Sequence, residues 1–125
     1  MSTVTLTDTT FNETVTGDVT VLVDFWAEWC GPCRMFGPVY DKVSGEFPDV
    51  VFAKVDTEEQ QALAAAFNIT SIPTLMAIRE GVVLYSQPGA IPEGALRNLV
   101  SKVTELDMAE VHAEIAKQGA GTSSE

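Results

Sequence analysis

The sequence has only two cysteines and one histidine, and it has few basic residues. Seven lysines and arginines stand against 18 aspartates and glutamates, which gives a formal net charge of −11 at pH 7. A surface with this charge repels nucleic acid and anionic lipid, so we expect neither as a partner. The single histidine, His112, lies far along the chain from both cysteines. That distance disfavours a closed zinc site, which has four ligands.

No segment has the character of a targeting or membrane-spanning element. Residues 1–8 are polar and lack the basic and apolar regions of a secretory signal. The longest apolar run, Val19–Ala27, is interrupted by Thr20 and Asp24 and is too short to cross a bilayer. We therefore expect a cytoplasmic protein with no membrane partner. In such a reducing compartment, two cysteines spaced C-x-x-C are more often catalytic or metal-binding than structural.

The chain has 125 residues, which is enough for one domain with its own core. Hydrophobic residues make up 46% of it and charged residues 20%, a globular composition. Residues 1–104 are expected to form this domain, and we expect it to be a monomer. Residues 105–125 are expected to form an extension, with a helix over 107–117 that Asp107 caps and a flexible tail after it.

The expected helix of the extension carries a narrow apolar stripe formed by Met108, Val111 and Ile115. The sequence leaves three interpretations of the extension open. The helix packs on the domain surface, it contacts a partner or a second copy of the chain, or the extension is disordered.

The order of strand and helix patterns indicates an α/β fold. Five strands are expected, at Thr3–Leu6, Val19–Trp26, Val50–Asp56, Thr74–Arg79 and Val82–Gln87. Four helices are expected before the extension: from Asp8 to about Val15, from after Cys30 to about Phe47, over Glu58–Phe67 with Thr57 as its cap, and over Glu93–Val103. The strands first alternate with helices and then form a hairpin at Glu80-Gly81. This order predicts a central mixed sheet of about five strands with helices on both faces.

The two cysteines stand where a buried strand passes into a helix. Cys30 and Cys33 are three residues apart in the expected first helical turn, so they share a face and can form a short disulfide. A thiolate at Cys30 would face the unpaired N–H groups and the positive dipole end of the helix, which favour the nucleophilic form. The alternative is a pair of buried, unreactive thiols. Arg34, and not histidine, follows Cys33, which excludes a c-type haem attachment motif.

Asp24 is an acid within an apolar strand. Burial should raise its pKa and keep it partly protonated near neutral pH. Such a group can take the proton from Cys33 as that sulfur becomes the second nucleophile. The alternative is an exposed acid at the strand end. Between the cysteines, Pro32 suits the start of a helix, and Gly31 lets a substrate backbone approach closely.

The motif Trp29-Cys30-Gly31-Pro32-Cys33 resembles the thioredoxin family. The resemblance covers about Thr3 to Val103, and it also rests on Trp26, Asp24, Pro38, Ile72-Pro73-Thr74 and Gly89. It implies the thioredoxin fold and a protein-disulfide reductase that works through a reversible Cys30–Cys33 disulfide. It also implies disulfide-containing target proteins and a flavin-containing thioredoxin reductase that draws on NADPH. The chain itself has no glycine-rich dinucleotide motif, so we expect it to bind no cofactor.

The resemblance also assigns roles to single residues. Cys30 would be the nucleophile, nearer the exposed end of the helix, and Cys33 the resolving thiol, while Gly31 and Pro32 would tune the potential. The Ile72-Pro73 bond would be cis, although X-Pro bonds in general favour trans. Residues near the disulfide would accept substrate: Trp29, Ile72, Pro73, Gly89 and Ala90.

Three residues have a supporting role under this resemblance. Lys54 falls where the family often places a lysine near the buried acid, but it may equally be a solvated strand residue. Trp26 and Pro38 are expected to give structural support, and Pro38 should bend its helix. For Trp29 and Trp26 alike, packing in the core is an alternative.

The chain departs from the common family pattern at Thr70-Ser71 and at Gly37, which bears on substrate preference and not on the chemistry. A rival function is a redox-gated binding module, in which the cysteines only switch the grip on a partner. A disulfide oxidase or isomerase is a further alternative within enzymes.

Overall fold

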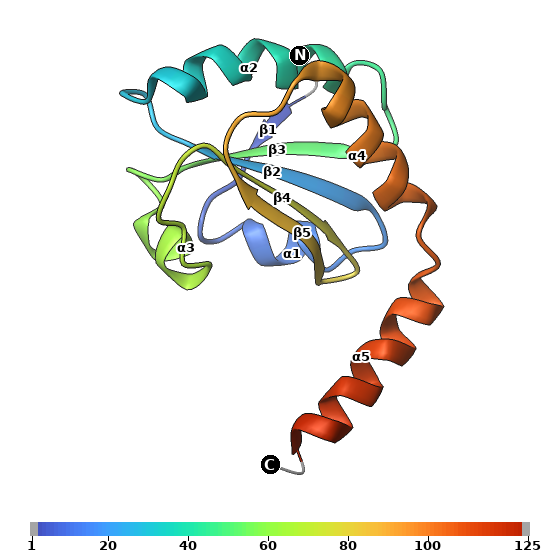
Figure 1. Cartoon of the computed structure of the whole chain (residues 1–125). Coiled ribbons are helices and arrows are strands. Elements are labelled where there is room, and N and C mark those ends of the chain that lie inside the picture. Colours follow the sequence, from blue (N-terminus) through green and yellow to red (C-terminus); the bar gives the residue numbers. More distant parts are fainter. Residues whose placement is uncertain (1–2, 124–125) are drawn as a thin grey trace.

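A computed structural model describes residues 3–123, with side chains described as far as residue 118. Five strands form one mixed sheet in the order β1-β3-β2-β4-β5 (Figure 1). The strands are β1 (Thr3–Thr5), β2 (Thr20–Trp26), β3 (Val51–Asp56), β4 (Thr74–Arg79) and β5 (Val82–Pro88). β3 runs parallel to both β1 and β2, whereas β4 runs antiparallel to β2 and to β5. This arrangement confirms the predicted five-stranded mixed sheet.

Helices cover both faces of the sheet. They are α1 (Phe11–Val15), α2 (Gly31–Ser44), α3 (Gln61–Ala66) and α4 (Glu93–Glu105), and a further helix, α5 (Met108–Ser123), follows them. α2 and α4 lie on one face, and α1 and α3 lie on the other (Figure 1). The hairpin between β4 and β5 turns at Glu80 and Gly81, which both have positive φ, as a tight hairpin requires.

The central strand β2 supplies both halves of the core, because successive side chains of a strand point to opposite faces. Leu22 packs with residues of α2 and α4. On the other face, Val21, Val23 and Phe25 pack with residues of α1 and with apolar residues in and after α3. All of β2 except the half-buried Trp26 is buried. Asp24 shares the α2 face with Leu22, which places an acid directly beneath the helix that follows the cysteines.

The predicted start of the third helix is wrong. α3 begins at Gln61 and not at Glu58, because the Asp56 carboxylate accepts hydrogen bonds from the N–H groups of Glu58 and Glu59, at 2.9 and 3.4 Å, and holds a turn there. Thr57 does not cap the helix, since its hydroxyl donates to the carbonyl of Trp26 at 3.0 Å.

The first helix also starts later than predicted. α1 begins at Phe11, and Thr10, not Asp8, is its N-cap residue. The backbone N–H of Asp8 donates to the side chain of Gln60 at 3.0 Å, so this segment is tied to the α3 side of the molecule. α2 ends at Ser44, three residues before the predicted end at Phe47.

The helix of the extension is longer than predicted. Asp107 caps it as expected, since its carboxylate accepts from the N–H of Ala109 at 3.0 Å. The helix continues to Ser123, so residues 119–123, predicted to be loose tail, are helical, and residues 124–125 lie outside the described residues. Met108 is buried, but Ile115 is 43% exposed, and the helix projects away from the sheet (Figure 1). Packing on the domain surface is therefore confined to its first turns.

Side chains of the β4–β5 hairpin hold the start of the extension. The Arg79 guanidinium donates to the carbonyls of Val103 and Leu106, both at 2.9 Å, and to that of Thr104 at 3.4 Å. These carbonyls lie at and just after the end of α4, where a helix has fewer backbone donors for its carbonyls. His112 of α5 lies 2.7 Å from the carboxylate of Glu80.

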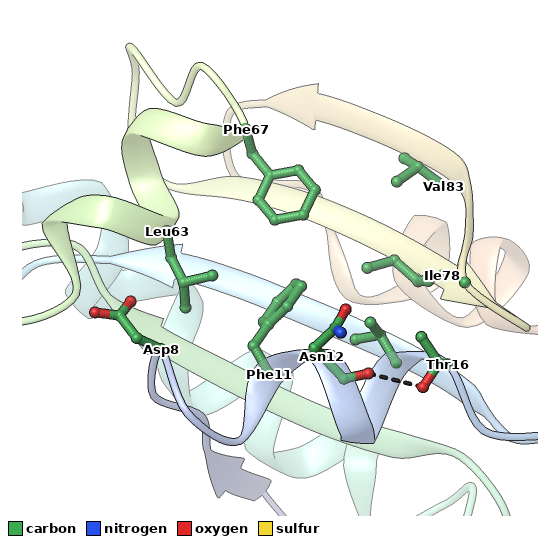
Figure 2. A pocket seen from close by; sticks show the side chains of 10 residues that line it. Asp8, Phe11, Asn12, Thr16, Leu63, Phe67, Ile78 and Val83 are labelled. Carbon is green, nitrogen blue, oxygen red and sulfur yellow. Dashed lines mark hydrogen bonds between the residues drawn. The ribbon is translucent and has the colours of Figure 1, made fainter.

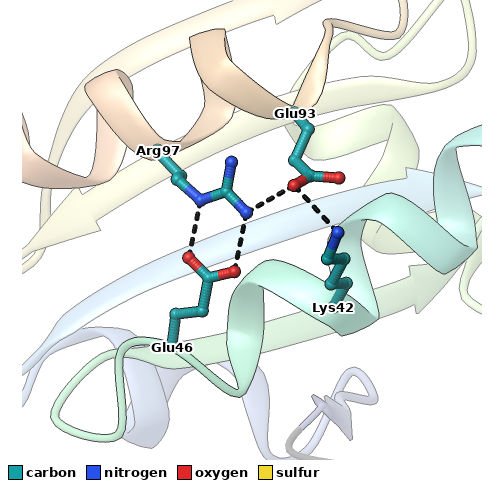
Figure 3. Close-up of polar contacts among 4 residues, drawn as sticks. All are labelled: Lys42, Glu46, Glu93 and Arg97. Carbon is teal, nitrogen blue, oxygen red and sulfur yellow. Dashed lines mark hydrogen bonds and ion pairs between the residues drawn. The ribbon is translucent and has the colours of Figure 1, made fainter.

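A network of charged side chains joins α2 to α4 (Figure 3). Arg97 donates two hydrogen bonds to Glu46, at 2.6 and 2.7 Å, and also bonds to Glu93. Lys42 lies 3.1 Å from the same Glu93 carboxylate. The hydrogen bonds from Arg97 lower the pKa of both glutamates. The network fixes α4 against the C-terminal half of α2, on the same face of the sheet as the cysteines.

Candidate active site

The two cysteines lie at the junction of β2 and α2 and are joined by a disulfide. Cys30 is the N-cap residue of α2, and its Sγ accepts a hydrogen bond from the backbone N–H of Cys33 at 3.2 Å. The Cα atoms of the two residues are 5.3 Å apart, within the usual range for a disulfide. Cys33 lies in the first turn as predicted, whereas Cys30 lies just before the helix, where one of the free N–H groups of the helix points at its sulfur.

Exposure does not distinguish the two cysteines. Each is only 4% exposed, so the expectation that Cys30 is the more accessible one is wrong for the disulfide form. Both are enclosed by Ala27, Trp26 and Ile72. Their positions still differ, because Cys30 lies beside the exposed Trp29 and Gly31, whereas Cys33 lines a cavity under α2.

Asp24 is completely buried, which excludes the exposed strand-end alternative. Neither of its carboxylate oxygens has a hydrogen-bond partner among the described residues. Burial raises its pKa to about 7, against the pull of the Lys54 ammonium, which lowers it, and with a smaller rise from the negative charge of Asp41. At neutral pH this carboxyl group is therefore poised between its two protonation states, as the sequence predicted.

A cavity of about 360 Å³ connects Cys33 with charged side chains. It is lined by Trp26, Cys33, Arg34, Gly37, Pro38, Asp41 and Lys54. Lys54 is half-buried, and its Nζ lies 5.2 Å from the centre of the Trp26 ring, so the fully solvated alternative for this lysine is wrong. Lys54 is also the partner of Asp24 in the β2–β3 register. Pro38 lies inside the continuous helix α2 and forms part of the wall.

Most of the predicted substrate residues come from two loops, one before β4 and one after β5. The Ile72-Pro73 bond is cis, as the resemblance implied and against the general preference of X-Pro bonds. The carbonyl oxygen of Ile72 lies 3.7 Å from the Sγ of Cys30. Gly89 has φ +103° and donates to the carbonyl of Pro73 at 2.7 Å, and the next residue, Ala90, is exposed. The loop after β5 is thereby tied to the cis-proline loop.

The two tryptophans near the site have different surroundings. Trp29 is 69% exposed, so the core alternative is wrong for this residue. Its indole N–H donates to Glu58 at 3.3 Å. Trp26 is half-buried against the cysteines, and its indole N–H has no acceptor in the part of the chain that the structure describes. Trp26 therefore both packs against the buried cysteines and forms part of the cavity wall.

Sequence reasoning missed two acids near the site. Glu58, the partner of Trp29, was predicted to start a helix, and nothing in the sequence signals its contact. Asp41 had a usable signal, because Cys33, Gly37 and Asp41 are spaced by four along α2 and so share one helix face. A search along that face would have placed Asp41 on the cavity that Cys33 lines.

A second cavity, of about 270 Å³, lies on the opposite face of the sheet (Figure 2). Phe11, Leu63, Phe67 and Ile78 give it an apolar wall, and Asp8 and Asn12 stand at its edge. No cysteine lines it, so it is separate from the redox site. Across residues 3–118, no group of three or more His, Cys, Asp or Glu side chains is placed to hold a metal ion. None of the described helices has the length and apolar character needed to cross a membrane.

Comparisons with known proteins agree with this geometry. The thioredoxin family model matches residues 2–102. A putative thioredoxin 2 of Streptomyces coelicolor is 56% identical over 119 residues, which cover 95% of this chain and 89% of that protein. Thioredoxin 1 of Synechococcus elongatus is 43% identical, covering 78% of this chain and 92% of its own. The crystal structure of a Malassezia sympodialis thioredoxin superposes with a TM-score of 0.74 at 34% identity, covering 81% of this chain and 90% of that one.

Proposed function

This chain belongs to the thioredoxin family and is a thiol–disulfide oxidoreductase, and on that premise we propose that Cys30 is its nucleophile and Cys33 its resolving thiol. The observation that carries the assignment is the hydrogen bond from the N–H of Cys33 to the Sγ of Cys30. A donor aimed at this sulfur from the start of a helix favours its thiolate. Cys33 has no comparable position, since it lies inside the first turn.

The exchange runs in two steps. The Cys30 thiolate attacks one sulfur of the target disulfide, a mixed disulfide forms, and the other target sulfur leaves as a thiolate. Cys33 then gives its proton to the Asp24 carboxylate and attacks the Sγ of Cys30, so that the second target sulfur leaves. The target gains two electrons and, after protonation, two thiols, and the chain is left with the Cys30–Cys33 disulfide. Asp24 suits this transfer because its pKa of about 7 lets it hold or release a proton at neutral pH.

The recognition surface that we propose surrounds the disulfide. An extended target segment pairs with the backbone of Ile72 in the manner of an added strand. Trp29 and Ala90 border it, and Pro73 and Gly89 fix the loops that carry it. Gly31 and Pro32 leave the approach to Cys30 open, because no atom lies within 4 Å of where a side chain on Gly31 would begin. Lys54 and Trp26 support Asp24 and the cysteines from beneath α2.

The oxidised chain must be reduced again for each turnover. The proposed electron donor is a flavoprotein thioredoxin reductase that draws on NADPH, in the cytoplasm, and the chain is proposed to work as a monomer. The proposed functional domain is residues 1–104, with residues 105–125 as an extension. The 119-residue match to the Streptomyces protein runs beyond residue 104, so the extension is in part shared with that relative.

The test is NADPH-coupled reduction of a model disulfide protein with a thioredoxin reductase supplied. The wild type should turn over, and Cys30→Ser should not. Cys33→Ser should accumulate a mixed disulfide through Cys30, visible by mass spectrometry. No turnover by the wild type beside an active control thioredoxin contradicts the proposal. A biological function that persists in the double serine variant would instead favour the redox-gated binding module.

A further inference from the structure

We propose that Asp41, on the outer part of α2, is a positioning residue that tunes proton transfer between Cys33 and Asp24 by opposing the charge of Lys54. The proposal deepens the proposed function, because it rests on the role given there to Asp24. It concerns a residue outside the C-x-x-C motif and the recognition loops.

The cavity under α2 brings Cys33, Lys54 and Asp41 together. The buried Asp24 is the partner of Lys54 in the β2–β3 register. Cys33 is buried at one part of its wall, and Asp41 is an exposed residue at another, so the cavity links the resolving sulfur to the surface. Cys33, Gly37 and Asp41 follow one another at intervals of four residues along the helix face that covers it. Gly37 lies between them and close to Lys54, since a side chain there would begin 3.8 Å from the Nζ of Lys54.

Two opposite charges on this cavity act on the buried acid. The Lys54 ammonium favours the ionised form of Asp24, and the Asp41 carboxylate favours the protonated form. Both charges act on Asp24, the charge of Lys54 more than that of Asp41, and Asp24 is fully buried with no hydrogen-bond partner for its oxygens among residues 3–118. Burial of Asp24 reduces the screening of these charges at its end of the interaction, whereas Asp41 itself is exposed.

The other groups facing this region do not replace Asp41. From α2, Tyr40 is buried with its hydroxyl donating to the carbonyl of Ala53 at 2.8 Å, and Arg34 lines the cavity from the exposed side. From β4, the residue in register with Asp24 is the apolar Leu75. Asp41 is thus the one carboxylate among the residues that line the cavity. Without it, the positive charge of Lys54 would act on Asp24 unopposed.

The expected consequence concerns the pH range of the second step. Loss of the Asp41 charge should move the titration midpoint of Asp24 to lower pH by roughly 0.3 to 0.8 unit, the size expected for a charge several ångströms away in a partly screened site. A weaker base at position 24 takes the proton of Cys33 less readily at neutral pH. Release of the mixed disulfide should slow by at most about fourfold at pH 7, because a lower midpoint also leaves a larger fraction of Asp24 ionised and able to accept the proton.

The experiment follows the Asp24 carboxyl carbon by NMR through a pH titration of the full oxidised chain. Asp41→Asn removes the charge, Asp41→Glu keeps it, and Asp49→Asn removes an equal charge from a loop residue that does not line this cavity. The expected result is a lower midpoint for Asp41→Asn alone. A midpoint that moves no further in Asp41→Asn than in Asp49→Asn overturns the proposal.

Asp24→Asn separates this inference from the proposed function. If it leaves the rate of mixed-disulfide release and its pH profile unchanged, the role of Asp24 is wrong, and the link from Asp41 to catalysis falls with it. If it slows release while Asp41→Asn leaves the Asp24 midpoint in place, only the inference about Asp41 fails. Asp41 is exposed, so we expect all variants at this position to fold, and their unfolding temperatures check this.

Discussion

Asp24 is a carboxyl group with no hydrogen-bond partner among the described residues, in the middle of an otherwise apolar strand. Its neighbours in β2 are Val23 and Phe25, both fully buried, and these residues build the core. An ionised carboxylate is costly in such a place, which is why its pKa is raised to about 7. The acid therefore weakens the fold at the same pH at which it is proposed to serve the reaction.

This cost predicts a dependence of stability on pH. The folded chain holds a proton on Asp24 that the unfolded chain releases above pH 3.8. Stability from this group is therefore fully present below pH 3.8 and is lost as the pH rises to about 7 and above. The difference between the two pKa values corresponds to about 4 kcal/mol.

Asp24→Asn should remove that dependence. We expect the oxidised variant to resemble the wild type in stability near pH 4 and to exceed it by up to about 4 kcal/mol at pH 8.5. Urea unfolding at both pH values measures this, with Asp49→Asn as a control for the loss of one negative charge. Equal stability of wild type and Asp24→Asn at pH 8.5 would show that the buried acid carries no such penalty.

Trp29 gives a second prediction for a single residue. It is 69% exposed, so Trp29→Ala should leave the free energy of unfolding within about 0.5 kcal/mol of wild type. As a proposed border of the recognition surface, its removal should raise KM for a protein disulfide several-fold, with little change for a small disulfide. Val83→Ala, at an exposed apolar residue of β5, is the control. An equal loss with both substrates would mean that Trp29 acts on the cysteines and not on recognition.

At the scale of the elements, Arg79 joins the end of β4 to the end of α4. Its guanidinium bonds to the carbonyls of Val103, Thr104 and Leu106 at and just after the end of α4, and Leu106 lies next to α5. One side chain thus ends α4 and fixes the start of the extension.

Arg79→Ala should free these carbonyls and lower the stability by about 2 kcal/mol. Amide hydrogen exchange should accelerate in residues 103–112 more than in the sheet. Lys102→Ala, which removes the same charge from the last turn of α4, should have a much smaller effect. Unchanged exchange at residues 103–112 would mean that burial of Met108 alone holds the extension.

Long patterned elements were predictable from the sequence, and their ends were less so. The predicted bounds of β2 are correct to within one residue, because a run of large apolar side chains is typical of a strand buried on both faces. The start of α3 was wrong because the Asp56 carboxylate holds a turn at Glu58 and Glu59, while the Thr57 hydroxyl donates to the carbonyl of Trp26 in the neighbouring strand. Such long-range contacts leave no local signal.

The candidate site also has features that the sequence predicts and features that it does not. The cysteines, Asp24 and the positions of Ile72 and Pro73 follow from the motif and the resemblance. The equal burial of both cysteines does not, because it depends on how Trp26 and Ile72 enclose the disulfide. The length of α5 was also underestimated, since glycine and polar residues after 118 disfavour a helix and yet the helix continues to Ser123.

At the scale of the whole molecule, the chain combines a two-faced α/β domain with a helix that projects from one end of it (Figure 1). The cysteines and the cavity under α2 belong to the domain, whereas α5 buries Met108 and contacts Glu80 of the β4–β5 turn through His112. Chemistry and extension are therefore separate in structure, which suggests that they are separable in experiment.

Removal of residues 107–125 should leave the rate of disulfide reduction within about twofold of the full chain. The truncated chain should be less stable by about 1 to 2 kcal/mol, because it loses the buried side chain of Met108. Coupled reduction assays and thermal unfolding of both forms measure this. A loss of activity with the fold intact would place part of the recognition surface on α5.

The central claim is that the start of α2 makes Cys30 a thiolate at neutral pH. The most direct measurement is the rate of alkylation of Cys30 by iodoacetamide as a function of pH, in the reduced Cys33→Ser variant and in the reduced wild type. The account predicts a midpoint at least one unit below the value of about 8.5 for a free cysteine. A midpoint at or above about 8.5, or a thiol that the reagent cannot reach, would contradict it.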